Sequence, residues 1–138
     1  MPSVLSFQAA LERIRRLCNV TVAGIWLYQG LVPKLLGPHP DEVAMSNALG
    51  IPPHLQASAS YAAGAGEVLL GLCVLLLHRR AWPQVISAVA TAVLLVFVAI
   101  YTPRYLIGAF NPVVMNVASI ALSIVALLAL RAEATSAG

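Results

Sequence analysis

Glu67 is the residue whose type and position most directly indicate chemistry. It lies near the middle of a long apolar run, with no basic residue close to it in sequence. A charged side chain at mid-bilayer costs about 2.5–3.5 kcal/mol on insertion scales, so such a residue rarely faces lipid. It shares a helical face with the small residues Ser60, Gly64 and Gly71, which allow close helix packing. The pattern predicts that Glu67 faces a packed interior, either as a ligand- or proton-binding carboxylate or as a hydrogen-bonded packing element.

Other polar and aromatic residues could form a pocket with Glu67. The candidates are Trp26, Gln29, Lys34, Arg104 and Asn116. Interhelical hydrogen bonding explains Gln29 and Asn116 equally well, and snorkelling to lipid headgroups is the alternative for Lys34 and Arg104. Further polar residues are predicted to converge on the same axis: Asn19, Ser87, Thr91, Ser119 and Ser123.

The composition is that of a chain whose surface faces lipid. Of its 138 residues, 60% are apolar and 9% are charged, and the mean hydropathy is +0.88. Soluble domains carry roughly 25% charged residues. So few charges could not cover a water-exposed surface, and we expect one integral membrane domain over residues 1–138.

Four apolar runs are long enough to cross the hydrocarbon core, which takes about 20 helical residues. They cover about residues 17–33, 55–77, 84–102 and 113–130. Lipid offers no partner for free backbone groups, and four strands cannot close a barrel, so the runs must be helices. Pro83 and the pair Asn111-Pro112 mark two helix starts. The predicted fold is an all-α integral membrane four-helix bundle.

Two shorter helices are predicted outside the spans. Residues 6–16 form an amphipathic helix that is expected to lie in the interface and lead into the first span. Its apolar side holds Phe7, Leu11 and Ile14, and its polar side largely holds Glu12, Arg13, Arg15 and Arg16. Residues 40–49 begin with proline and two acids and stop before Gly50, which predicts a short interfacial helix between spans 1 and 2. Residues 132–138 are small and polar and are expected to fray.

The distribution of basic residues predicts the orientation. Four spans place both termini on one side, which carries most of the cations: Arg13, Arg15, Arg16, Arg79, Arg80 and Arg131. The other side holds Lys34 and Arg104 together with the acids Asp41 and Glu42. By the positive-inside rule, both termini are predicted to be cytoplasmic in a multi-pass protein of the cell inner (plasma) membrane.

Several functional classes are excluded or disfavoured. The basic residues lie at the ends of apolar runs, where headgroups and topology explain them, so nucleic-acid binding is excluded. Cys18 and Cys73 form no CxxC pair, and the three histidines are scattered. We expect neither a structural disulfide nor a metal site.

Three segments together resemble the signatures of the DoxX-like membrane proteins. Residues 26–36 (WLYQGLVPKLL) with 39–42 (HPDE) resemble the first signature, residues 64–67 (GAGE) with Gly71 the second-helix signature, and residues 110–112 (FNP) with Asn116 the one before the fourth helix. The resemblance implies a four-helix membrane bundle. The wider group is named after a subunit of a quinone-linked thiosulfate oxidoreductase. Histidine is common in the family where this chain has Gln29, and the chain lacks a cysteine pair, so proton-relay and thiol-redox roles are weakened.

The leading hypothesis is a membrane protein that binds an amphiphilic small molecule in an outer-half pocket, as an accessory to a redox system. A quinone is the first candidate ligand. Glu67 would hydrogen-bond or protonate its head, Trp26 would stack on it, and Lys34 and Arg104 would guard the mouth. A protein partner would have to supply the electrons. The alternatives are an assembly subunit of a membrane complex or homo-oligomer, and a small proton-coupled transporter that would have to oligomerise because no inverted repeat is present.

Overall fold

The computed structural model describes residues 4–37, 39–108 and 112–136, and every regular element among them is helical. In chain order these are α1 (Val4–Gly30), η1 (Leu31–Leu35), α2 (Pro40–Ala48), α3 (Pro53–Leu76), α4 (Trp82–Tyr101), η2 (Pro103–Leu106) and α5 (Pro112–Ser136). The all-α prediction is therefore confirmed over the described residues.

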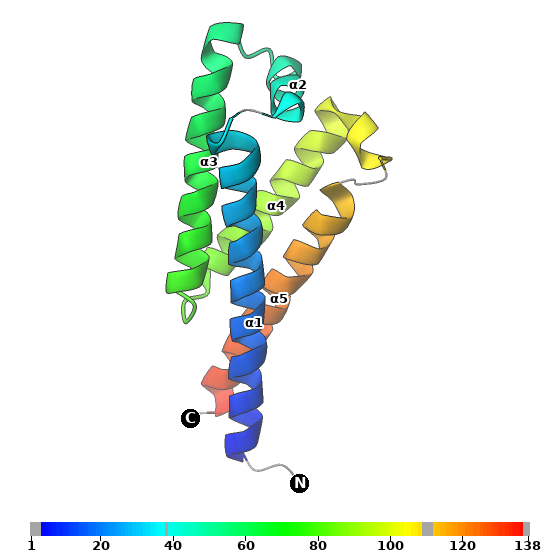
Figure 1. Ribbon diagram of the computed structural model, residues 1–138. Helices are drawn as coiled ribbons and strands as arrows, with labels where there is room; N and C mark the ends of the chain where they lie inside the picture. The colour runs from blue at the N-terminus through cyan, green and yellow to red at the C-terminus, as the bar shows by residue number, and fades with distance from the viewer. Residues whose placement is uncertain (1–3, 38, 109–111, 137–138) are drawn as a thin grey trace.

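Four long helices pack lengthwise, and the start of α1 and the end of α5 lie at the same end of the molecule (Figure 1). α1 packs against α3 and α5, and α4 packs mainly against α5. The short helix α2 lies at the opposite end, beside the first turns of α3 (Figure 1). α3 and α4 diverge from their connecting turn toward that end. A cavity lies there, and residues of α2 and of the four long helices line it.

Three of the helices are long and apolar enough to cross a membrane: α3, α4 and α5. They correspond to the second, third and fourth predicted spans. α1 is not among them, because Arg13, Arg15 and Arg16 lie inside the helix and its uncharged part ends at Gly30. That uncharged part is shorter than the roughly 20 residues that a crossing requires.

The interior is more polar than the exterior, as expected for a chain surrounded by lipid. The apolar core is small: Val22, Ala23, Trp26 and Val74 form one buried cluster, and further buried apolar residues among those described are Cys18, Val98, Ala126 and Ala129. Large apolar side chains cover the outside instead, with Leu69 63% and Leu76 70% exposed. The predicted polar residues of the axis are buried: Asn19, Ser87, Thr91, Ser119 and Ser123. Lipid contact stabilises exposed apolar groups and penalises polar ones, which explains this reversal.

The small-residue face of α3 packs closely against α1, as its spacing predicts. Ser60, Gly64 and Gly71 are buried. A Cβ added to Gly30 of α1 would lie 2.6 Å from the carbonyl oxygen of Gly64, and one added to Gly64 would lie 2.8 Å from that of Gly30. The two backbones meet where neither residue has a side chain. The crossing lies close to Lys34, which follows Gly30 in the chain, and close to Glu67, which follows Gly64 on α3.

The short helix predicted over residues 40–49 is present as α2. Pro40 occupies its first position, and the His39 imidazole accepts a hydrogen bond from the Asp41 backbone N–H at 3.3 Å. Proline at this position costs no helical hydrogen bond. Of the two predicted helix starts, Pro83 is the second residue of α4 and Pro112 is the first of α5, while Asn111 lies outside the described residues.

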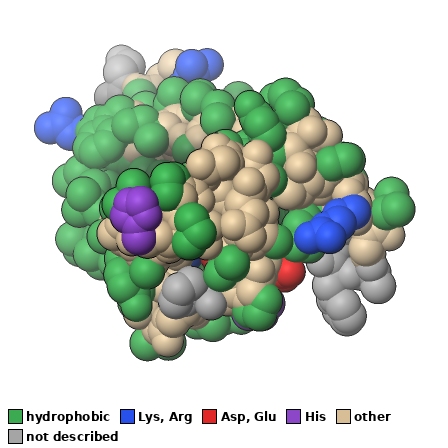
Figure 2. All heavy atoms as spheres, turned by 90° about the horizontal axis from the view of Figure 1, so that it is seen from above, with side chains coloured by type: hydrophobic (Ala, Val, Ile, Leu, Met, Phe, Trp, Pro, Cys, Tyr) green, Lys and Arg blue, Asp and Glu red, His purple; other side chains and the backbone are tan. Residues whose placement is uncertain are grey.

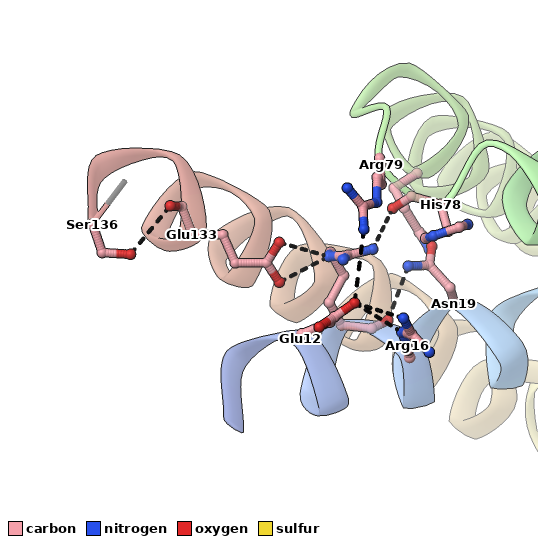
Figure 3. Close-up of polar contacts among 9 residues, drawn as sticks. Glu12, Arg16, Asn19, His78, Arg79, Glu133 and Ser136 are labelled. Carbon is pink, nitrogen blue, oxygen red and sulfur yellow. Dashed lines mark hydrogen bonds and ion pairs between the residues drawn. The ribbon is translucent and has the colours of Figure 1, made fainter. Parts of the chain in front are cut away.

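The predicted amphipathic face of residues 6–16 is wrong at Arg15. Phe7 and Ile14 are 52% and 45% exposed, whereas Arg15 is only 2% exposed. The guanidinium of Arg15 donates from Nε to both Glu133 oxygens at 2.9 and 3.1 Å, and from Nη1 to the His78 carbonyl oxygen at 2.8 Å (Figure 3). Because these acceptors lie between the helices, the charge turns inward and the apolar groups turn outward.

The C-terminal end is helical rather than frayed, which corrects the prediction for residues 132–138 as far as Ser136. α5 continues to Ser136, whose carbonyl oxygen accepts a hydrogen bond from Gln8 Nε2 at 3.1 Å. The ion pair between Glu133 and Arg15 holds the same turn against α1 (Figure 3). Small polar residues would fray without these partners, and tertiary contacts supply them.

Candidate functional site

A cavity of about 450 Å³ lies at the α2 end of the molecule. Its walls come from α1, α2, α3, α4 and α5, and Lys34 enters it from η1. Most of the surface is apolar; the apolar lining includes Ile25, Met45, Leu49, Leu94, Phe97 and Val98. Ligand pockets of proteins are typically 300–1,000 Å³ and mostly apolar, with a few polar groups placed among the apolar ones. This cavity has that character.

The turn that carries Lys34 is a π-helix, and it directs this side chain inward. Pro33 lacks an N–H, so the regular α-helical bond at that position cannot form. The chain instead closes a wider turn, in which the Leu36 N–H donates to the Leu31 carbonyl oxygen at 2.9 Å. One added residue per turn rotates the following side chains about the helix axis. Lys34 is 8% exposed as a result.

Lys34 joins two carboxylates inside the cavity. Its Nζ lies 2.9 Å from Glu42 Oε1 on α2 and 3.2 Å from Glu67 Oε2 on α3. The side chains of Lys34, Glu42 and Glu67 are only 10%, 17% and 13% exposed. We call these three residues the cavity cluster. Buried charges are tolerated when they are paired, and the cluster ties η1, α2 and α3 together.

Several polar atoms at the cavity accept no hydrogen bond from the described residues. Glu67 Oε2, although near the Lys34 ammonium, accepts no hydrogen bond with suitable geometry. The hydroxyls of Ser60 and Ser119 also line the cavity and are unpaired, in side chains whose residues are 6% and 2% exposed. Unsatisfied buried polar atoms are uncommon and call for an explanation. A ligand head group in the cavity would supply the partners.

Trp26 forms part of the cavity wall, and its indole N–H is already hydrogen-bonded. The indole Nε1–H donates to Ser87 Oγ at 2.7 Å, and Ser123 Oγ lies 3.5 Å from the same oxygen. The ring is 5% exposed. Its position is therefore set by α4 and α5, and only its ring surface is available to an occupant. Stacking is the contact that it can offer.

The structure brings five of the six predicted site residues to this cavity. Trp26, Gln29, Lys34, Glu67 and Asn116 all line it. Gln29 reaches across to α5, where its Nε2 contacts Met115 Sδ at 3.7 Å. The sixth, Arg104, is not in the lining: it is exposed on η2, with its guanidinium 5.1 Å from the centre of the Tyr105 ring. Arg104 therefore does not form part of the cavity wall.

α2 and η2 are connected above the cavity. The Tyr105 hydroxyl donates to Asp41 Oδ1 at 2.9 Å, and Arg104 Nη2 lies 3.4 Å from the same hydroxyl. Seen from this end, hydrophobic side chains form most of the periphery and little acidic surface is visible (Figure 2). Val93 and Leu94 line the cavity and are also 61% and 41% exposed. The cavity therefore communicates with the outer surface along α4.

Sequence reasoning missed two features of the site. Glu42 was expected on an interfacial helix, and Lys34 at the mouth of the pocket or at lipid headgroups, so neither was expected as a direct partner of Glu67. The available signal was weak: Lys34 and Glu42 flank a short loop and carry opposite charges. Their meeting with Glu67 depends on the π-helical turn and on the glycine crossing, which local patterns do not specify.

Comparison with known proteins identifies the family to which the sequence is similar. The model of the DoxX-like family matches residues 23–124, which include the whole lining of the cavity. No curated protein matches the chain, and no solved structure does. The resemblance inferred from the three signatures is confirmed by the family match.

Proposed function

This chain belongs to the DoxX-like family and is a small multi-pass membrane protein, and we propose that it binds an amphiphilic small molecule in the cavity around Glu67. The observation that carries the proposal is the cavity cluster. It places Lys34, Glu42 and Glu67 together in the wall of a mostly apolar cavity.

The division between polar and apolar walls supports an amphiphile over a fully polar or fully apolar ligand. A head group placed at the cluster would meet Glu67 and the free hydroxyls of Ser60 and Ser119. Gln29 and Asn116 line the same cavity and add amide groups. An apolar chain would contact Trp26 and leave along Val93 and Leu94, where lining residues reach the lipid-facing surface.

A quinone or its hydroquinone is the first candidate, and an accessory role in a membrane redox system is the corresponding role for the protein. The head of such a molecule offers two oxygens and a flat ring, which suit the cluster and the Trp26 ring surface. The electrons would come from a protein partner. Arg104 and Tyr105 would hold α2 over the entrance through Asp41.

The proposed placement in the membrane has four crossings, with α1 and η1 together forming the first. α1 lies between α3 and α5, and the single charge of η1 is paired inside the protein. The end that carries both termini also carries Arg13, Arg16, Arg79, Arg80 and Arg131. By the positive-inside rule, we assign this end to the cytoplasmic side of the inner membrane.

The test is mass spectrometry of an organic extract from purified protein. Wild type is compared with Glu67→Gln and with the matched control Glu12→Gln, which makes the same change at an exposed residue of the opposite end. We expect one amphiphile in stoichiometric amount in wild type and control, and its loss from Glu67→Gln.

Bulk phospholipid alone in all three samples would contradict the proposal. It would direct attention to an assembly subunit, for which co-purifying membrane proteins would be the next observation. Equal retention of one amphiphile in all three samples would place its head group away from Glu67.

A further inference from the structure

The cavity cluster has unequal numbers of acidic and basic groups. Two carboxylates, Glu42 and Glu67, share one ammonium, Lys34. Among the described residues no other cation lines the cavity, and Arg104 lies outside it. In a mostly apolar enclosure an unbalanced charge is costly and attracts a compensating group. A positive or hydrogen-bond-donating group would compensate the carboxylate that exceeds the single ammonium.

The free atoms of the cavity have the matching chemistry. Glu67 Oε2 is buried beside the Lys34 ammonium and accepts no hydrogen bond of suitable geometry from the described residues, and an ionised carboxylate only accepts. The hydroxyl oxygens of Ser60 and Ser119 can accept as well, and both are unpaired and almost fully buried. The one indole donor of the wall, Trp26 Nε1–H, is already bonded to Ser87. The hydroxyls of Ser60 and Ser119 can donate as well, so it is the excess carboxylate of the cavity cluster that selects the head group.

From this charge count and these free acceptors we infer that the ligand carries a cationic or hydrogen-bond-donating head group, such as an ammonium or hydroxyl, and that anionic heads are rejected. The inference rests on the proposed function, since it specifies the head group of the same amphiphile. Within a quinone pair it selects the hydroquinone, because its hydroxyls donate to Glu67 and the quinone carbonyls cannot.

Three probes with one chain and different heads test this: dodecylamine, dodecanol and dodecanoate. The chain has two tryptophans, and Trp82 is 46% exposed at the start of α4. In a Trp82→Phe background, the fluorescence of Trp26 alone reports occupation of the cavity. Binding is measured in lipid nanodiscs at matched mole fractions of each probe in the bilayer, so that membrane partitioning is the same.

We expect dodecylamine and dodecanol to bind, and dodecanoate to bind at least about tenfold more weakly than dodecylamine, because a third carboxylate would be repelled. Glu67→Gln should bring the amine and carboxylate affinities closer together, and Glu42→Gln should do so independently if Glu67→Gln folds poorly. Glu12→Gln should leave the order unchanged.

The outcomes separate the two proposals. Dodecanoate binding as tightly as dodecylamine in wild type would overturn the inference about the head group and leave amphiphile binding intact. No response of Trp26 to any of the three probes would overturn the proposed function and this inference together.

Discussion

Buried charges occupy both ends of the helix bundle, but they are arranged differently. At the end with the termini, Arg15 meets Glu133 in a one-to-one pair, and its guanidinium also donates to the His78 carbonyl oxygen (Figure 3). At the α2 end, Lys34 is shared by Glu42 and Glu67, beside a cavity. The first arrangement is balanced and hydrogen-bonded, and the second has one carboxylate too many and a free acceptor.

The difference indicates what each region does. A charge pair that satisfies itself leaves nothing for a ligand and connects α1, α5 and the α3–α4 turn. An unequal cluster next to a cavity is a poor way to stabilise a fold, since partly satisfied buried groups carry an energetic cost. The contrast supports a structural role for Arg15 and a binding role for the cavity cluster.

The largest expected effect is that of Arg15→Leu. It leaves the Glu133 carboxylate and the His78 carbonyl oxygen without their shared donor. Breaking a buried pair costs about 3–5 kcal/mol, and since Glu133 is 23% exposed we expect the lower end, about 3 kcal/mol, in the free energy of unfolding measured in detergent.

The double variant Arg15→Leu/Glu133→Leu is the control for this prediction. Replacing both partners by apolar residues is often neutral, so it should recover most of the lost stability. A double variant less stable than Arg15→Leu would mean that the pair is not the source of the loss.

The next effect concerns the helix crossing that positions the cavity cluster. Gly30→Ala would place a methyl group 2.6 Å from the Gly64 carbonyl oxygen and should lower the free energy of unfolding by about 1–3 kcal/mol. Gly66→Ala is the matched control, because a Cβ there meets nothing within 4 Å; it should stabilise α3 by about 0.5–1 kcal/mol. Equal thermal shifts for both variants would contradict the close approach.

A smaller effect compares one acid from each end. Glu42→Gln leaves Lys34 paired with Glu67, so we expect a change in unfolding free energy of less than about 1 kcal/mol. Glu133→Gln leaves the buried Arg15 without its only ion-pair partner among the described residues and should cost more. If Glu42→Gln proved the more damaging, the cavity cluster would be a structural element.

The smallest effect is a pH dependence at Glu12. The pKa of Glu12 is lowered because Arg16 donates hydrogen bonds to its carboxylate and adds a favourable charge. A carboxyl with a lowered folded-state pKa stabilises the fold above the unfolded-state value, and this stability is lost as pH falls through the folded-state pKa. Below about pH 4.5, wild type should therefore lose slightly more stability than Glu12→Gln. Identical pH profiles would mean that the Arg16 contact contributes nothing.

Apolar run length and small-residue spacing predicted a large part of this fold. The ranges of α3, α4 and α5 follow from run length, and the buried face of Ser60, Gly64 and Gly71 follows from spacing. The short helix α2 follows from its initial proline and acids and from Gly50. Trp26, Gln29, Glu67 and Asn116 were also singled out, because polar or aromatic groups within apolar runs tend to face the interior. Arg15 was placed on an exposed polar face because the prediction assumed that charged side chains turn toward water. In the structure the charged side chain turns inward to Glu133, and apolar side chains turn outward.

The sequence by itself therefore determined the helical, membrane-embedded class and the interior position of Glu67, since both depend on the solvent that each segment tolerates. Only the tertiary structure decided which charges meet. The contact of Lys34 with Glu42 and Glu67 requires a π-helical turn at Pro33 and a backbone crossing at Gly30 and Gly64. The pairing of Arg15 with Glu133 requires the two ends of the chain to lie side by side. Periodicity specifies the face on which a residue lies, but contact between distant residues depends on the rotation and depth of whole helices.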